Sequence, residues 1–267
     1  MEKYTSINSF SINRNVLFQG IIISLKERME YPGNTIALLF VMTLNFSIYM
    51  FMFTITSNLF LENLNWTLKE FSLFILFSYF CNRFFYVFDA RFLFRRLLLG
   101  ELNVSLTKPA KPFILENTRM MNGQDLIVLP FIGIPALIIF LSGEYQISLI
   151  LLFILILFMC WYNFILSQCI GSFGFISKML PWTLHRIDKE LLGTTRVFTP
   201  KVFETSLLKN FVYILPSTLM GFGLIEFLLG KTYIYEYFLY AIIFSIILIG
   251  ITILNWSGGL KKYEAFS

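Results

Sequence analysis

Long apolar runs, separated by short polar and basic segments, dominate the hydropathy pattern of this chain. A helix needs about 20 mostly apolar residues to cross the hydrocarbon core of a bilayer. We expect six runs to form transmembrane helices, because backbone groups in lipid must be satisfied within their own segment. The predicted spans cover about residues 35–60, 71–88, 126–141, 147–170, 208–229 and 235–256.

A different kind of helix is predicted before the first span. Its apolar residues recur at helical spacing with polar residues between them, and they are Phe18, Ile21, Ile22, Leu25 and Met29. Pro32 and Gly33 then interrupt the chain before the membrane segment begins. The pattern predicts an amphipathic helix over about residues 13–31 in the inner membrane interface. A frayed cytoplasmic tail is the alternative.

The composition agrees with a membrane protein. Hydrophobic residues make up 57% of the chain and charged residues 14%, whereas soluble domains carry about a quarter charged residues. A soluble fold of this size could not bury so much apolar surface, and the runs are too long for barrel strands. The predicted fold class is all-α, a polytopic membrane protein that forms a single domain over residues 1–267.

The basic residues predict the orientation. Placing the N-terminus in the cytoplasm puts 17 of the 21 Lys and Arg residues in cytoplasmic segments, which are residues 1–34, 89–125, 171–207 and the tail after Trp256. Both termini are then cytoplasmic, and Trp66 and Trp256 fall at the outer and inner boundaries. Because the positive charge serves orientation, the net charge of +5 does not indicate a nucleic-acid partner.

Residues that usually carry catalysis or metal binding are sparse. Cys81, Cys160 and Cys169 lie in apolar runs without metal-ligand spacing, and His185 is the only histidine. No serine lies in a nucleophile-elbow pattern. We therefore predict no metal site, no cofactor and no enzymatic activity in this chain.

One segment looks like the end of a phosphate-binding loop, namely Gly230-Lys231-Thr232. That motif requires a glycine five residues before its Gly-Lys pair, and Ile225 occupies the position. Lys231 is therefore predicted to be an ordinary loop cation, and the chain shows no nucleotide-binding motif of its own.

Arg83 is the clear charge within a predicted span, about five residues from its inner end. A charge in lipid indicates a functional role by default, yet a long side chain so placed can snorkel to the headgroups or form a structural pair. Both interpretations stay open. The residues that we single out as candidates for a pathway or gating role are Arg83, Asn82, Pro216, Gly221 and Gly223.

The stretch after the second span carries the richest local signals. Arg95 and Arg96 end that span, and Gly100 can end the helix in a left-handed conformation. Residues 101–106 can then form a short turn with its leucines on one face.

Two prolines, Pro109 and Pro112, stiffen the exit from this turn. The outcome would be a short, rigid element just below the membrane, suited to docking onto a soluble partner. An ordinary inner loop without a partner explains the pattern equally well.

The same stretch resembles the cytoplasmic loop of the bacterial type 2 export permeases of ABC transporters. The similarity rests on Gly100-Glu101-Leu102, then Leu106, Lys108, Pro109 and Pro112, and on the tail Gly259-Leu260-Lys261-Lys262-Tyr263-Glu264. The ATPase-coupling element implied by the resemblance comprises Arg95, Arg96, Gly100, Glu101, Leu102, Ser105, Leu106, Lys108, Pro109 and Pro112.

The resemblance further implies a permease homodimer or pseudo-symmetric heterodimer, with two copies of a partner ATPase that bind ATP and Mg. We therefore expect the permease subunit of an ATP-driven exporter in the bacterial inner membrane. Its cargo would be hydrophobic or amphipathic, such as a lipid-like molecule, a drug or a peptide, because the spans carry few charges. The alternatives are a non-transporting assembly or sensor subunit and, less favoured, a membrane-embedded transferase.

Overall fold

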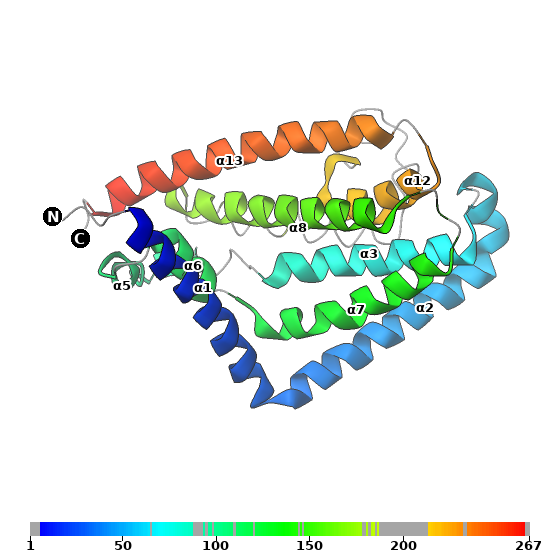
Figure 1. Ribbon diagram of the computed structural model, residues 1–267, viewed down its shortest axis with the longest axis horizontal. Helices are drawn as coiled ribbons and strands as arrows, with labels where there is room; N and C mark the ends of the chain where they lie inside the picture. The colour runs from blue at the N-terminus through cyan, green and yellow to red at the C-terminus, as the bar shows by residue number, and fades with distance from the viewer. Residues whose placement is uncertain are drawn as a thin grey trace.

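The elements of this fold are all helices, as far as the described residues go (Figure 1). The computed structural model describes residues 6–64, 66–87, 93, 96–97, 99–108, 111–119, 121–143, 145, 147–177, 180, 183–184, 186, 213–231 and 234–264. Arg95 and Pro109 lie outside these residues, as do residues 208–212 of the fifth predicted span. The all-α class is therefore confirmed for the described part of the chain.

Five long helices form the body of the molecule (Figure 1). They follow one another across it in the order α2 (Pro32–Leu64), α7 (Gly123–Leu141), α3 (Leu68–Val87), α8 (Leu149–Ser172) and α13 (Ile234–Glu264). Short connections join α2 to α3 and α7 to α8, so these sequence neighbours run antiparallel. The second predicted span, α3, lies at the centre of this layer.

Four stretches among the described residues are long and apolar enough to cross a membrane. They are Pro32–Met52, Gly123–Leu141, Leu149–Phe175 and Ile234–Lys261, which correspond to the first, third, fourth and sixth predicted spans. The second predicted span is the 20-residue helix α3, which carries Glu70 and Arg83. The total of six spans stays a prediction.

Helix α3 is the core of the layer because its apolar side chains have neighbours on both sides. Leu73, Phe74, Ile75 and Phe77 are all at most 3% exposed. By contrast, only 11% of the residues in Pro32–Met52 of α2 are buried. One face of the layer's edge helix α2 is therefore free of contacts with the described chain.

The fifth predicted span departs from a continuous helix. Leu215 is extended, with φ −62° and ψ 137°, and Pro216 then begins α11 (Pro216–Thr218). A residue before proline is disfavoured in the helical region, which explains the break. The chain continues through the π-helical turn η3 (Leu219–Gly223) into α12 (Leu224–Leu228).

Helix α1 (Ser6–Met29) lies across the end of the layer where α13 ends (Figure 1). It packs on α6 (Pro112–Arg119) and on the start of α7, where a Cβ added to Gly123 would lie 2.2 Å from the Ser24 carbonyl oxygen. Phe18 and Met29 of the predicted apolar stripe remain 64% and 70% exposed. A helix therefore occupies this segment, and its place in the membrane interface stays a prediction.

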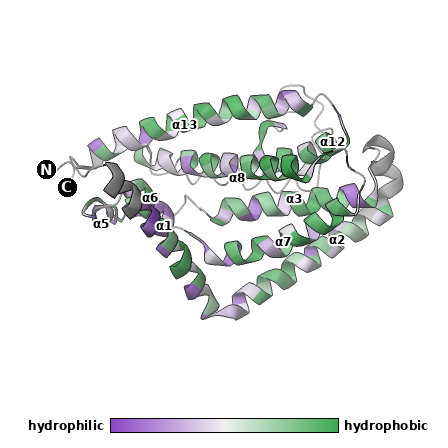
Figure 2. Cartoon of the chain, viewed as in Figure 1, coloured by the Kyte–Doolittle hydropathy of each residue, from purple (hydrophilic) through white to green (hydrophobic). Residues whose placement is uncertain are grey.

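The distribution of hydropathy follows this architecture. Figure 2 shows mostly hydrophobic residues along α7, α8 and α13, and hydrophilic residues around α6 and the adjoining part of α1, while the middle of α1 is hydrophobic. The end of the layer that holds α1, α6 and the short helix α5 (Asn103–Leu106) is thus its polar end.

Candidate functional site

The segment that leads into α5 turns sharply at Gly100, whose φ is 71°. Glu101 N–H donates to the Arg96 carbonyl at 3.0 Å, and Gly100 N–H donates to the Leu97 carbonyl at 3.4 Å. This pair of bonds is the Schellman arrangement, which requires a left-handed residue and favours glycine. The prediction for Gly100 is confirmed, and the turn brings the Glu101 carboxylate within 3.2 Å of the Arg96 guanidinium.

Helix α5 presents one face inward and one outward. Leu102 and Ser105 are fully buried, and Leu106 is half-buried. Val104 is 50% exposed, and Lys108 is also exposed. The predicted short turn over residues 101–106 is therefore present, with its leucines toward the protein.

The inner side of α5 is held by Glu116 of α6, whose side chain is fully buried. Its carboxylate accepts a hydrogen bond of 2.6 Å from Arg96 Nη1 and another from the Ser105 hydroxyl. Arg119 Nη1 also donates to Ser105 Oγ at 3.3 Å. A buried carboxylate needs such donors because an unpaired charge is costly there. These contacts join α5 and α6 into one unit, which we call the α5–α6 unit.

The α5–α6 unit is attached to two of the candidate membrane helices. Gln168 of α8 donates its amide to Asn117 Oδ1 at 2.6 Å. Phe113 packs edge-on against Trp256 of α13, with ring centroids 5.3 Å apart. Movement of the unit would therefore act directly on α8 and α13.

Most of the predicted coupling residues lie in or beside this unit. Those that the structure describes are Arg96, Gly100, Glu101, Leu102, Ser105, Leu106, Lys108 and Pro112, the last being the first residue of α6. Sequence reasoning missed Glu116 and Arg119. The available signal was that Glu116 is the only acidic residue between Glu101 and Asp125, in a segment rich in Lys and Arg.

Arg83 forms an ion pair that links α3 to α7. Its Nη1 lies 3.0 Å from Asp125 Oδ1, and the two side chains are 21% and 5% exposed. Asn122, the N-cap of α7, donates to the second Asp125 oxygen at 2.6 Å. Arg83 therefore forms a structural pair, and a pathway or gating role for it stays a prediction.

Polar side chains also line the centre of the layer. Asn163 of α8 donates to the Cys81 carbonyl of α3 at 2.6 Å. Asn82 is 2% exposed, and its amide nitrogen has no hydrogen-bond partner among the described atoms. The same holds for the hydroxyls of Ser78 and Thr218. Asn82, a predicted pathway residue, is thus enclosed between helices.

The other predicted pathway residues lie where the fifth segment meets α3. A Cβ added to Gly221 would lie 2.0 Å from Ser78 Oγ, and one added to Gly223 would lie 3.0 Å from the Leu219 side chain. The π-turn therefore approaches α3 closely only because Gly221 has no side chain. Pro216 is the first residue of α11, at the start of this region.

The opposite end of the layer contains a buried acid that the sequence analysis overlooked. Glu226 of α12 is fully buried within the fifth predicted span, so Arg83 is not the sole charge within the spans. Its Oε1 accepts from Trp66 Nε1 at 2.9 Å and pairs with Lys231 Nζ at 2.9 Å. Gly230, with φ 73°, turns Lys231 back toward α12.

Trp66 is packed inside the protein at this end of the layer. It is 3% exposed and packs between Phe74 and Phe222, at ring-centroid distances of 5.6 and 5.3 Å. Nearby, burial and the Glu70 carboxylate raise the pKa of Tyr145 to about 12, so its hydroxyl is neutral. This end of the layer is closed by side chains from three segments.

A comparison with known proteins adds the family. A model for an ABC-2 family transporter protein matches residues 39–267, most of the chain. No curated protein and no solved structure matches. The matched region contains the Gly100 turn, the α5–α6 unit and the buried acids Asp125 and Glu226. The chain belongs to the ABC-2 family of transporter proteins, a family of membrane permeases.

Proposed function

We propose that this chain is the permease subunit of an ATP-driven ABC exporter in a bacterial inner membrane. The family supports a transport permease and implies an ABC ATPase as partner. The proposal adds the direction of transport, a hydrophobic or amphipathic cargo, and the place where the ATPase docks. ATP and Mg would be bound by that partner.

The observation that carries the proposal is the construction of the α5–α6 unit. A short surface helix would normally fray, because isolated turns are unstable in water. Here the buried Glu116 fixes α5 through Ser105 and Arg96, and α6 contacts α8 and α13. A rigid element of this kind can transmit a push from a soluble partner to the helices.

The solvent-exposed face of the α5–α6 unit is suited to such a partner. Leu99 and Val104 are 61% and 50% exposed, and Glu101 and Lys108 lie beside them. Exposed apolar residues with a polar rim are typical of a protein interface. The docking site of the ATPase would therefore centre on Leu99 and Val104.

The remaining features of the proposal concern assembly and topology. The largely free helix α2 supports a permease homodimer or pseudo-symmetric heterodimer, with one ATPase on each permease. Six spans place both termini and the α5–α6 unit in the cytoplasm, on the side with the most Lys and Arg. The cargo would pass between the two permeases and not through one chain.

The alternatives receive less support. Among the described buried acids, Glu116, Asp125 and Glu226 each pair with a cation, and Glu70 accepts hydrogen bonds from Thr67; these contacts indicate structural roles and not acid–base catalysis. A transferase is therefore disfavoured. A non-transporting assembly or sensor subunit would also bind an ATPase, and a transport assay separates it from a permease.

The deciding experiment is co-purification in mild detergent from native membranes. We expect a stoichiometric P-loop ATPase with the wild-type chain, and its loss in Val104→Asp. The matched control is Leu68→Asp, because Leu68 is also 50% exposed but lies at the other end of the layer. Both variants need unchanged thermal unfolding.

An ATPase retained by both Val104→Asp and Leu99→Asp would reject this docking site. A wild-type chain that binds no ATPase, under conditions where a known exporter keeps its own, would reject the exporter itself.

A further inference from the structure

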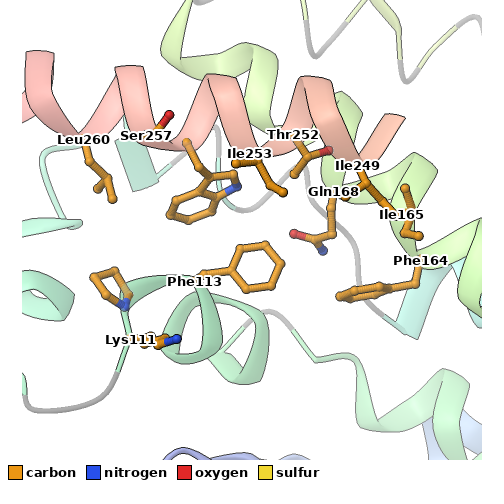
Figure 3. Close-up of a pocket in the computed structure, with 12 residues that line it drawn as sticks. Lys111, Phe113, Phe164, Ile165, Gln168, Ile249, Thr252, Ile253, Ser257 and Leu260 are labelled. Carbon is orange, nitrogen blue, oxygen red and sulfur yellow. The ribbon is translucent and has the colours of Figure 1, made fainter. Parts of the chain in front are cut away.

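A pocket of about 630 Å³ lies between α6, α8 and α13, at the polar end of the layer (Figure 3). Its wall is almost wholly apolar. The side chains that form most of it are Phe113, Phe164, Ile165, Ile249 and Ile253. A pocket of this kind favours a hydrocarbon ligand, because apolar surface gains by leaving water.

Three polar residues of the wall already have hydrogen-bond partners, whereas the Trp256 indole nitrogen, also in the wall, has none among the described atoms. Thr252 and Ser257 donate their hydroxyls to carbonyls of their own helix, at 2.7 and 3.1 Å. Gln168 donates its amide to Asn117. A polar ligand would therefore replace few of its hydrogen bonds to water, whereas an alkyl chain has none to lose.

The length of the pocket matches one membrane leaflet. From Ile249 to Leu260 it follows α13 for about 17 Å at a rise of about 1.5 Å per residue. Half of a hydrocarbon core of about 30 Å is about 15 Å. Because α13 contains a candidate membrane span, the pocket runs in the direction of a lipid chain.

The two ends of the pocket differ in charge. Figure 3 shows Lys111 near the end marked by Leu260, while Phe164 and Ile249 lie at the opposite end. The Lys111 side chain is exposed and forms no ion pair with any described residue. Lys261, next to Leu260, is exposed as well. The end of the pocket with Lys111 and Lys261 would therefore attract an anionic group, and the apolar end would not.

We infer that the pocket binds one acyl chain of an anionic phospholipid from the surrounding leaflet, with the phosphate beside Lys111. The lipid would lie between α6 and the pair α8 and α13, alongside the contact of Phe113 with Trp256. It would therefore hold the α5–α6 unit against the membrane helices. This site does not depend on the proposed export or on the ATPase.

Native mass spectrometry of the full-length chain, titrated with phosphatidylglycerol or phosphatidylcholine, tests this inference. We expect one retained phosphatidylglycerol, bound about fivefold more tightly than phosphatidylcholine, which is the contribution of one lysine near an anionic lipid. Lys111→Gln should remove most of that preference and leave the weaker binding of either lipid.

A pocket-filling pair of variants supplies the matched control. Ile253 and Ile246 are both 61% exposed on α13, and only Ile253 lines the pocket. Ile253→Trp should lose the retained lipid, whereas Ile246→Trp should keep it. Equal retention by the two variants would overturn the inference. A change in the number of chains per particle in Ile253→Trp alone, with lipid retained, would also overturn it and identify an interface between copies.

A second measurement needs no pocket-filling variant. Trp256 lines the pocket. Its contribution to the fluorescence is obtained by subtracting the emission spectrum of Trp256→Phe from that of the wild-type chain. In vesicles, phosphatidylglycerol with brominated acyl chains should quench this component at a lower mole fraction than brominated phosphatidylcholine. Equal quenching by the two lipids would contradict an anionic lipid site.

Discussion

Arg96 Nη1 and the Glu116 carboxylate lie 2.6 Å apart, although 20 residues separate them along the chain. The contact holds a short surface helix, α5, to a helix that touches α8 and α13. Removal of one partner of a buried ion pair costs more than the pair contributes, because the remaining charge is stranded. The α5–α6 unit therefore depends on Glu116 more than on any residue of its exposed face.

The first prediction concerns this contact. Glu116→Ala should destabilise the α5–α6 unit by about 1–3 kcal/mol, because Arg96 and Ser105 lose their buried acceptor while Arg96 keeps only its contact with the exposed Glu101. Glu101→Ala is the control, since Glu101 is 50% exposed and should cost at most about 1 kcal/mol. Amide hydrogen exchange over residues 99–108 measures both. Similar protection in the two variants would contradict the role of Glu116.

A second prediction addresses the link between α3 and α7. Arg83→Gln and Asp125→Asn should each destabilise the protein, and the double variant should cost less than their sum. The coupling energy should be about 0.5–3 kcal/mol, as for residues in contact. A double-mutant cycle on thermal unfolding in detergent measures it. Strict additivity would mean that the 3.0 Å contact carries no energy.

The third prediction concerns the close approach of the π-turn to α3. Gly221→Ala should cost about 1–3 kcal/mol by overpacking, because its Cβ would lie 2.0 Å from Ser78 Oγ. Gly250→Ala is the control, because nothing lies within 4 Å of that position and helical alanine is favoured over glycine by about 1 kcal/mol. Ser78→Ala should partly rescue Gly221→Ala in thermal unfolding. Without rescue, the clash lies elsewhere.

A fourth prediction tests the end of the layer opposite to α1 and α6, where Trp66 meets Glu226. Trp66→Phe removes the indole donor to Glu226 and should cost about 1.5–3 kcal/mol, the usual range for a hydrogen bond to a charged group. Trp161→Phe is the matched control, because Trp161 is 43% exposed on α8. The free energy of unfolding of each variant in detergent decides the matter. A cost for Trp66→Phe no larger than for the control would show that the bond is dispensable.

Much of this protein could be predicted from local features of the sequence. Four apolar runs form helices of spanning length, Gly100 takes the left-handed conformation, and residues 101–106 contain the short helix α5. These features depend on a few neighbouring residues, so hydropathy, helix length and turn chemistry suffice to predict them. The family resemblance was likewise carried by short local motifs.

The partners of the charged residues were decided by tertiary structure alone. Trp66 and Glu226 are 160 residues apart in the chain, yet the indole and carboxylate meet at 2.9 Å. Sequence reasoning placed Trp66 at the outer membrane boundary without a partner, and it did not single out Glu226 or Glu116. Sequence spacing does not indicate which helices pack together, and a buried charge is stable only beside the partner that packing supplies. The sequence by itself therefore determined the membrane character and the helices, and the packing decided which buried acids bind which cations.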